Sequence, residues 1–216
     1  MPTGVHLRDA RQRLFDAAEV LLLRDGPNAL TSRAVTEQAG VAKGVLHRHF
    51  SDFDDFLVAL VLDRATGLEA QSAELTAAVG DGSVADNLTT ALTSLFGPVP
   101  VAIIPLITFR DELRRRLRAA LPGGGIAILS QATTAISEYL SAERARGRIA
   151  AEADIGSLTL SLVGGGHLLH ADREPGPPSR ATVQKFVDGV VADVVRRADR
   201  GGPTQNAISS PSRATD

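Results

Sequence analysis

The sequence predicts an all-α protein of about nine helices, arranged as a small N-terminal three-helix unit and a larger helical unit. Apolar residues recur at helical spacing along most of the chain, and no segment shows the sustained apolar–polar alternation typical of β-strands. Aromatic residues, which strands favour, make up only 4% of the 216 residues. A hydrophobic content of 44% and a charged content of 22% are typical of globular proteins with a buried core.

The composition also excludes several classes of site. The chain contains no cysteine, which excludes disulfides, thiol nucleophiles and cysteine-based zinc or iron–sulfur sites. The N-terminal residues lack the pattern of a secretory signal, and no run of about 18 uncharged apolar residues could cross a membrane. We therefore expect a cytoplasmic protein without a membrane partner. A net charge of −2 excludes a uniformly basic nucleic-acid coat but allows a local basic face.

The N-terminal unit divides into three helices. Apolar residues at positions i, i+3, i+4 and i+7 predict the first helix: Leu14, Ala17, Ala18 and Leu21. An Asp-Gly-Pro sequence at 25–27 ends it, because glycine adopts the left-handed cap and proline cannot continue a helix. Two short helices follow at 33–39 and 43–49, separated by a turn at Gly40.

A larger helical unit follows. A long helix begins at Ser51 and Asp52 and runs to about residue 79, with acidic residues in its first turn. Further helices are predicted at 84–96, 99–121 (with a break expected near Pro105), 125–147, 151–172 and 179–200. We expect a DNA-reading unit at 1–52, a ligand-binding and dimerisation unit at 53–200, and a disordered tail rich in Gly, Ser, Thr and Pro at 201–216.

The DNA-reading interpretation comes from the helix–turn–helix pattern of residues 31–50. In such a motif the second helix lies in the major groove of DNA, where Lys and Arg donate to guanine or phosphate. The segment carries three basic residues against one acid. The same pattern also fits a surface helical hairpin with solvated charges. The candidate DNA contacts are Thr31, Ser32, Arg33, Lys43, Gly44, Val45, His47, Arg48 and His49.

The stretch from Arg11 to Leu57 resembles the N-terminal domain of TetR-family transcriptional regulators. The matching residues are Leu14, Phe15, Ala17, Ala18, Leu21, Gly26, Thr31, Arg33, Val35, Ala39, Gly40, Val41, Lys43, Gly44, Leu46, His49 and Phe50. The resemblance implies a ligand-responsive repressor that binds a palindromic double-stranded DNA operator as a homodimer. It also implies that a small effector, which we expect to be mainly apolar, releases the protein from DNA.

Three positions depart from the family pattern. His47 replaces a usual Tyr, Ala42 replaces a usual Ser, and Phe53 replaces a frequent Lys. These changes remove two usual contacts with the DNA backbone and predict weaker non-specific affinity. They favour an alternative in which the chain is a dimeric helical adaptor or ligand-binding protein with weak or lost DNA binding.

The last two predicted helices carry an apolar stripe. In the family the equivalent helices form a four-helix bundle between two subunits, although such a stripe could also pack within one subunit. We take it as the expected dimer face. Its residues are Ile155, Leu158, Leu162, Gly166, Leu169, Val183, Phe186, Val187, Val190 and Val194.

The middle helices hold more apolar residues than a thin helical layer needs, and the family encloses a ligand pocket there. The candidate lining residues are Phe96, Ile103, Ile107, Phe109, Gln131, Thr134, His167 and His170. A metal site at His167 and His170 would need a third converging ligand, so we expect neither a metal nor a cofactor. The sequence contains no nucleophile triad spacing, zinc-protease motif or P-loop, so we expect no enzyme.

Overall fold

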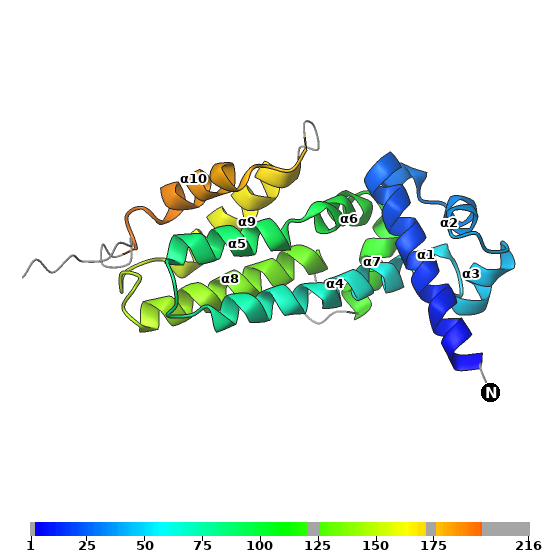
Figure 1. The fold of residues 1–216 in the computed structure, drawn as a ribbon, viewed down its shortest axis with the longest axis horizontal. Coiled ribbons are helices and arrows are strands. Elements are labelled where there is room, and N and C mark those ends of the chain that lie inside the picture. The colour runs from blue at the N-terminus through cyan, green and yellow to red at the C-terminus, as the bar shows by residue number, and fades with distance from the viewer. Residues whose placement is uncertain (1–2, 121–125, 172–175, 196–216) are drawn as a thin grey trace, which may run out of the picture.

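A computed structural model describes residues 3–120, 126–171 and 176–195, and these residues form ten α-helices (Figure 1). The helices are α1 (Thr3–Asp25), α2 (Ser32–Gln38), α3 (Gly44–His49), α4 (Phe53–Ala77), α5 (Val84–Leu95), α6 (Pro98–Thr108), α7 (Asp111–Ala120), α8 (Ala127–Ala145), α9 (Ile155–Ala171) and α10 (Arg180–Val191). A 3-10 turn, η1 (Pro27–Ala29), joins α1 to α2. The only β pairing among the described residues is a single bridge between Ile149 and Val195. The all-α prediction is confirmed.

The tenth helix arises because the predicted helix at 99–121 is two helices. The expected break near Pro105 is wrong, since α6 continues through Pro105 and ends at Thr108. Proline removes its own backbone donor and crowds the carbonyl four residues earlier, and this short helix accommodates both effects. Asp111 and Glu112 suit the positive N-terminal end of the new helix α7. The corner therefore lies at residues 109–110.

The helices α1 to α3 pack on the start of α4 around a small aromatic core. Phe15, Phe50 and Phe56 are buried, with ring centroids 5.1–6.0 Å apart. Side-chain caps fix where the helices begin: Thr31 Oγ1 accepts from Ala34 N at 3.1 Å, and Asp52 Oδ1 accepts from Asp55 N at 2.7 Å. These contacts hold α2 and α3 at one end of the long helix α4, as Figure 1 shows on the right.

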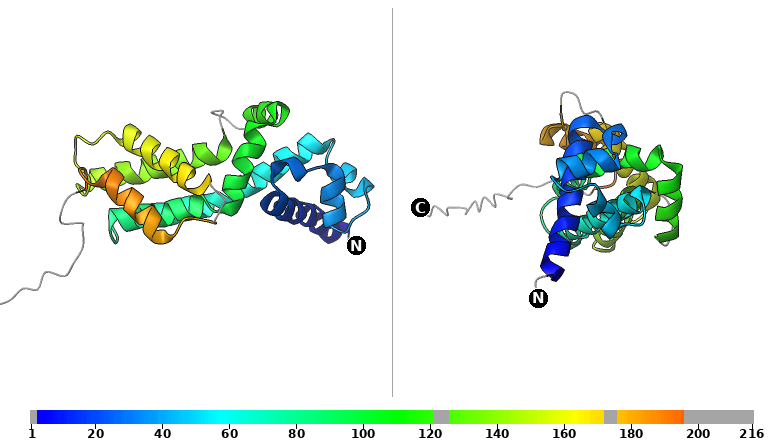
Figure 2. Two further views of the ribbon diagram at one scale, coloured as in Figure 1. Left: turned by 90° about the horizontal axis from the view of Figure 1, so that it is seen from above. Right: turned by 90° about the vertical axis from the view of Figure 1, so that its right-hand side faces the viewer.

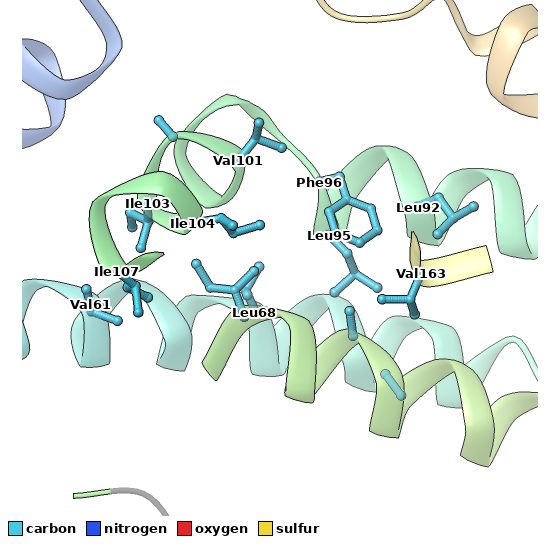
Figure 3. Close-up of a cluster of buried hydrophobic side chains, with 14 of the residues drawn as sticks. Val61, Leu68, Leu92, Leu95, Phe96, Val101, Ile103, Ile104, Ile107 and Val163 are labelled. Carbon is cyan, nitrogen blue, oxygen red and sulfur yellow. The ribbon is translucent and has the colours of Figure 1, made fainter. Parts of the chain in front are cut away.

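The remaining helices form an elongated bundle (Figure 2). Its main pairings are α4 with α8, α8 with α9, and α10 with both α5 and α9. Aliphatic side chains from α4, α5, α6 and α9 fill the interior, as Figure 3 shows for Leu68, Leu95, Ile107 and Val163. Within the described segments, no single helix is both long and apolar enough to cross a bilayer. The helices α5 and α6 are long and apolar enough only when they are taken together, and a bend of 58° separates them.

Candidate nucleic-acid interface and effector groove

Helix α3 presents its polar side chains to solvent because two apolar residues fix its inner face. Leu46 and Phe50 are buried in the aromatic core, whereas Lys43, His47 and Arg48 are exposed. Neither Lys43 nor Arg48 forms an ion pair with any described residue, and the predicted contacts Val45 and His49 are half-buried. The exposed cations of α3 are therefore available to an anionic partner such as a nucleic-acid backbone.

The start of α3 differs by one residue from the sequence interpretation. The helix begins at Gly44, so Lys43 rather than Ala42 occupies the N-cap position, and no side chain caps the helix. Gly44 is exposed, and a Cβ built there would meet nothing within 4 Å. A phosphate could therefore approach the backbone closely at this point.

Two of the predicted DNA contacts at the start of α2, Thr31 and Arg33, already interact with other residues of the subunit. Thr31 caps the helix, and Arg33 pairs with Glu37 at 2.7 Å, although both side chains are largely exposed. The hydroxyl of Ser32 is buried without a hydrogen-bond partner. Because exposed ion pairs are weak, Arg33 can exchange Glu37 for a phosphate at small energetic cost.

Two arginines of α1 support the turn between α2 and α3. Arg13 Nη2 donates to the carbonyl oxygen of Ala39 at 2.8 Å, next to Gly40, whose φ of 64° favours glycine. The guanidinium of Arg11 lies 5.1 Å from the ring centroids of both Phe15 and Phe50. Arg13 therefore supports the turn and Arg11 covers the aromatic core, two roles that the sequence pattern did not indicate.

Phe53, which stands where the family frequently has Lys, contacts an aromatic ring and an arginine. Its ring stacks on Phe56 at 5.5 Å, and the guanidinium of Arg110 lies 5.8 Å from its centroid on another side. Arg110 also donates to the Leu30 carbonyl oxygen at 3.0 Å, and Arg116 forms an ion pair with Asp52. The segment 110–118 carries five arginines with two adjacent acids, Asp111 and Glu112. This composition favours a solvated, salt-bridged face and does not indicate these contacts with the N-terminal helices.

Half of the predicted dimer stripe lies inside the subunit. The buried residues are Ile155, Leu162, Gly166, Val183 and Val187. Leu158, Leu169, Phe186, Val190 and Val194 are half-buried. α10 packs against α5 and α9, so the buried residues of the stripe have partners within the subunit. The dimer face remains a prediction.

Glycines of α9 permit that close packing. A Cβ on Gly165 would overlap the Phe186 ring, and one on Gly166 would lie 3.0 Å from Leu92. The outer face of α9 instead exposes two large apolar side chains, Leu160 and Leu168, each 74% exposed. This outer face also includes the exposed residues Ser157, Ser161 and Gly164.

The predicted pocket residues separate into three groups. Ile103 and Ile107 are fully buried and form part of the interior in Figure 3. On α8, Thr134 is exposed and Gln131 is half-buried. The others lie around α6: Phe109 is 82% exposed, whereas the buried ring of Phe96 lies 6.0 Å from the rings of both His167 and His170.

Two neighbouring hollows, here together named the α6–α9 groove, lie beside Val101. The first has a volume of about 320 Å³ and is lined by Val101, Ala102, Ile104, Pro105, Thr108, Phe109, His167 and Ala171. The second has a volume of about 270 Å³ and is lined by Leu23, Phe96, Pro98, Val101, His170, Gly176 and Pro177. The groove is mainly apolar with a few polar groups, which suits a small organic ligand.

The two histidines supply the polar groups of the groove. The Nδ1 atom of His170 lies 2.7 Å from the Gly166 carbonyl oxygen. The Nδ1 atom of His167 is buried without a hydrogen-bond partner, and burial together with the neighbouring His170 lowers the pKa of His167. Both effects favour the neutral form of the His167 ring. The described residues bring no third metal-ligand side chain to this pair, and Asp172 lies outside them.

Comparison with known proteins gives a match to one family model and several similar folds. Residues 14–60 match the model for "Bacterial regulatory proteins, tetR family". No curated protein sequence matches the chain significantly. Among solved structures, the chain is similar to a TetR-family transcriptional regulator from Agrobacterium tumefaciens, with a TM-score of 0.68 and 15% identity over 88% of this chain and 100% of that one.

Two further solved structures have similar folds. The FadR regulator of Bacillus subtilis, solved in complex with stearoyl-CoA, gives a TM-score of 0.64 and 16% identity over 84% of this chain and 97% of that one. The ketosteroid transcriptional regulator KstR2 of Mycobacterium tuberculosis gives 0.62 and 16% over 87% of this chain and 95% of that one. At these identities the likeness concerns the fold.

Proposed function

We propose that this chain, a transcriptional regulator of the tetR family, is a repressor that binds a palindromic DNA operator as a homodimer and leaves it when a small, mainly apolar effector binds. The observation that carries the proposal is the outer face of α3, where Lys43 and Arg48 are exposed and unpaired among the described residues. A helix held in this way by Leu46 and Phe50 suits insertion into the major groove.

Each element of the reading surface has a distinct role in this proposal. Arg48 and Lys43 contact guanine edges or phosphates, and the exposed ring of His47 donates to a phosphate in place of the usual Tyr. Thr31, Ser32 and Arg33 lie at the start of α2, which crosses the DNA backbone. In the complex with DNA, Arg33 contacts a phosphate instead of Glu37.

The dimer is proposed to form through the outer face of α9. Leu160 and Leu168 are large, exposed apolar side chains on one face of α9, and contact with a second copy would remove both from water. Gly164 and two serines on the same face allow a second helix to approach closely. A symmetric dimer then presents two copies of α3 to the two half-sites of an inverted repeat.

The effector is proposed to bind in the α6–α9 groove. Its walls are aliphatic and prolyl, and neutral His167 offers one unsatisfied ring nitrogen. The similar fold of a regulator crystallised with stearoyl-CoA, and that of a ketosteroid regulator, support an apolar effector for this chain as well. Effector binding then shifts the population of dimers away from the DNA-binding arrangement.

Selection from random duplex DNA tests the proposal. Purified protein is incubated with the library at low and at moderate salt, and the enriched sequences are compared with those selected by a K43A/R48A double variant. We expect an inverted repeat that the variant does not enrich, with affinity falling steeply as salt rises. Failure to enrich any sequence at either salt would instead favour the dimeric adaptor.

A further inference from the structure

Arg110 lies between the groove and the DNA-reading helices. It directly follows Phe109, which lines the larger hollow together with Thr108. Its Nη2 atom donates to the carbonyl oxygen of Leu30 at 3.0 Å, across 80 positions of sequence. Its guanidinium also lies 5.8 Å from the ring centroid of Phe53. One side chain therefore touches both the segment before α2 and the start of α4.

The Leu30 carbonyl is a sensitive point of the reading unit. Leu30 is fully buried and directly precedes Thr31, the N-cap of α2. Thr31 accepts from Ala34 N through its hydroxyl at 3.1 Å and from Val35 N through its carbonyl at 3.0 Å. Because α2 is only seven residues long, a shift of the backbone before Thr31 disturbs much of its hydrogen bonding.

Next to Arg110, Thr108 of the groove wall is held by two hydrogen bonds. Arg114 Nη1 donates to the Thr108 carbonyl oxygen at 2.8 Å, and Thr108 Oγ1 donates to the Ile104 carbonyl oxygen at 2.8 Å. The corner between α6 and α7 is thus fixed to both helices, so it moves with the groove wall. A ligand that displaces Thr108 or Phe109 displaces Arg110 too.

We propose that Arg110 transmits occupancy of the α6–α9 groove to the DNA-reading unit by releasing the Leu30 carbonyl. This inference rests on the proposed function and adds the residue that couples its two sites. The Arg116–Asp52 ion pair holds α7 to the start of α4. When residues 109–110 move, α7 therefore stays attached to α4 at Arg116. When the hydrogen bond from Arg110 to the Leu30 carbonyl oxygen is lost, the backbone before α2 is held less firmly. The hydrogen bonds of α2 then open more often.

A covalent occupant allows a test before the effector is known. Because the chain has no cysteine, Ala171→Cys places a single thiol at an exposed position of the larger hollow, where N-phenylmaleimide fills it. The control is Ala145→Cys with the same label, since Ala145 is the exposed last residue of α8 and lines neither hollow. Amide hydrogen exchange of the full-length chain is measured with and without label.

We expect label at position 171 to slow exchange in residues 98–108 and to speed exchange in residues 32–38 by about tenfold. Arg110→Gln alone should speed exchange in 32–38 to a similar extent, after which the label adds nothing there. Arg110→Lys, which keeps one donor, should be intermediate. Arg115→Gln is the matched control, because Arg115 pairs only with Glu112 among the described residues and is 70% exposed.

The inference fails if the label protects 98–108 but leaves 32–38 unchanged, or if it affects 32–38 equally with and without Arg110. Absence of protection at 98–108 would reject the groove as the coupled site. Circular dichroism confirms that each variant is folded. The exchange assay contains no DNA, so its failure would reject the Arg110 connection alone, whereas a failed DNA selection would reject the regulator.

Discussion

Arg116 in α7 donates to both carboxylate oxygens of Asp52, the N-cap of α4, at 2.8 and 2.9 Å. The same carboxylate accepts from the Asp55 backbone N–H at 2.7 Å. Asp52 therefore caps the helix and joins α7 to the reading unit at once. Hydrogen bonds from Arg116 and then from the Asp55 amide lower the pKa of Asp52, and bonds from Arg115 and Arg116 lower the pKa of Glu112 to about 2.

This arrangement predicts a loss of stability in acid. Both carboxyl groups have a lower pKa in the folded protein than in the unfolded chain, so their contribution is complete above about pH 4.5 and declines as the pH falls toward 2. Asp52→Asn keeps the cap, because Asn is an equally good N-cap residue, but removes the charge that Arg116 holds. Urea denaturation should show a smaller acid-induced loss in this variant than in the native chain.

The control for this comparison is Asp81→Asn, an exposed acid in the turn between α4 and α5 that forms no ion pair with the described residues. Its acid dependence should equal that of the native chain. If Asp52→Asn retained the full acid-induced loss, the Arg116 contact would not be the cause of the depressed pKa.

The reading unit was largely predictable because its signals are local. Asp52 caps the long helix that was expected to begin there, and Gly40, with a positive φ, lies in the expected turn. The buried positions Leu46 and Phe50 then determine which side chains of α3 face outward. The DNA contacts themselves remain predictions.

The larger unit was less predictable because its contacts join distant segments. A periodic stripe such as Val183 and Val187 shows that one helix face is buried but not which helix covers it, and here the cover is within the subunit. The hydrogen bond from Arg110 to the Leu30 carbonyl joins residues 80 positions apart, and no sequence spacing indicates it. Similarly, Ile103 and Ile107 are apolar enough for a pocket wall but pack in the interior.

A pair of helical glycines tests the packing of α9. Gly165→Ala should destabilise the fold by about 1–3 kcal/mol, because its Cβ would overlap the Phe186 ring and force it to move. Gly67→Ala in α4 is the matched control, since a Cβ at this exposed position meets nothing within 4 Å and alanine favours the helix by about 1 kcal/mol. Thermal unfolding of both variants should therefore shift in opposite directions, and equal shifts would contradict the packing.

Substitutions on α3 test the reading surface. Lys43→Ala and Arg48→Ala should each weaken binding to the selected operator by about tenfold, since each removes a charged interaction with DNA. Where the removed partner is a phosphate, the slope of log affinity against log salt should also become shallower by about one. Arg115→Ala, which changes the same charge on the remote helix α7, should leave both quantities near the native values. Native affinity together with a native salt slope in both α3 variants would place the DNA elsewhere.

The outer face of α9 predicts the oligomeric state. Leu160→Glu and Leu168→Glu each place a charge where a large apolar side chain is 74% exposed, so they should leave the subunit folded while opposing burial of that face against a second copy. Sedimentation velocity should show less dimer and more monomer for each variant than for the native chain. The double variant should contain the most monomer. Val20→Glu, on α1 and 44% exposed, carries the same change away from this face and should remain dimeric. A dimer that survives both α9 substitutions would show that another surface joins the subunits.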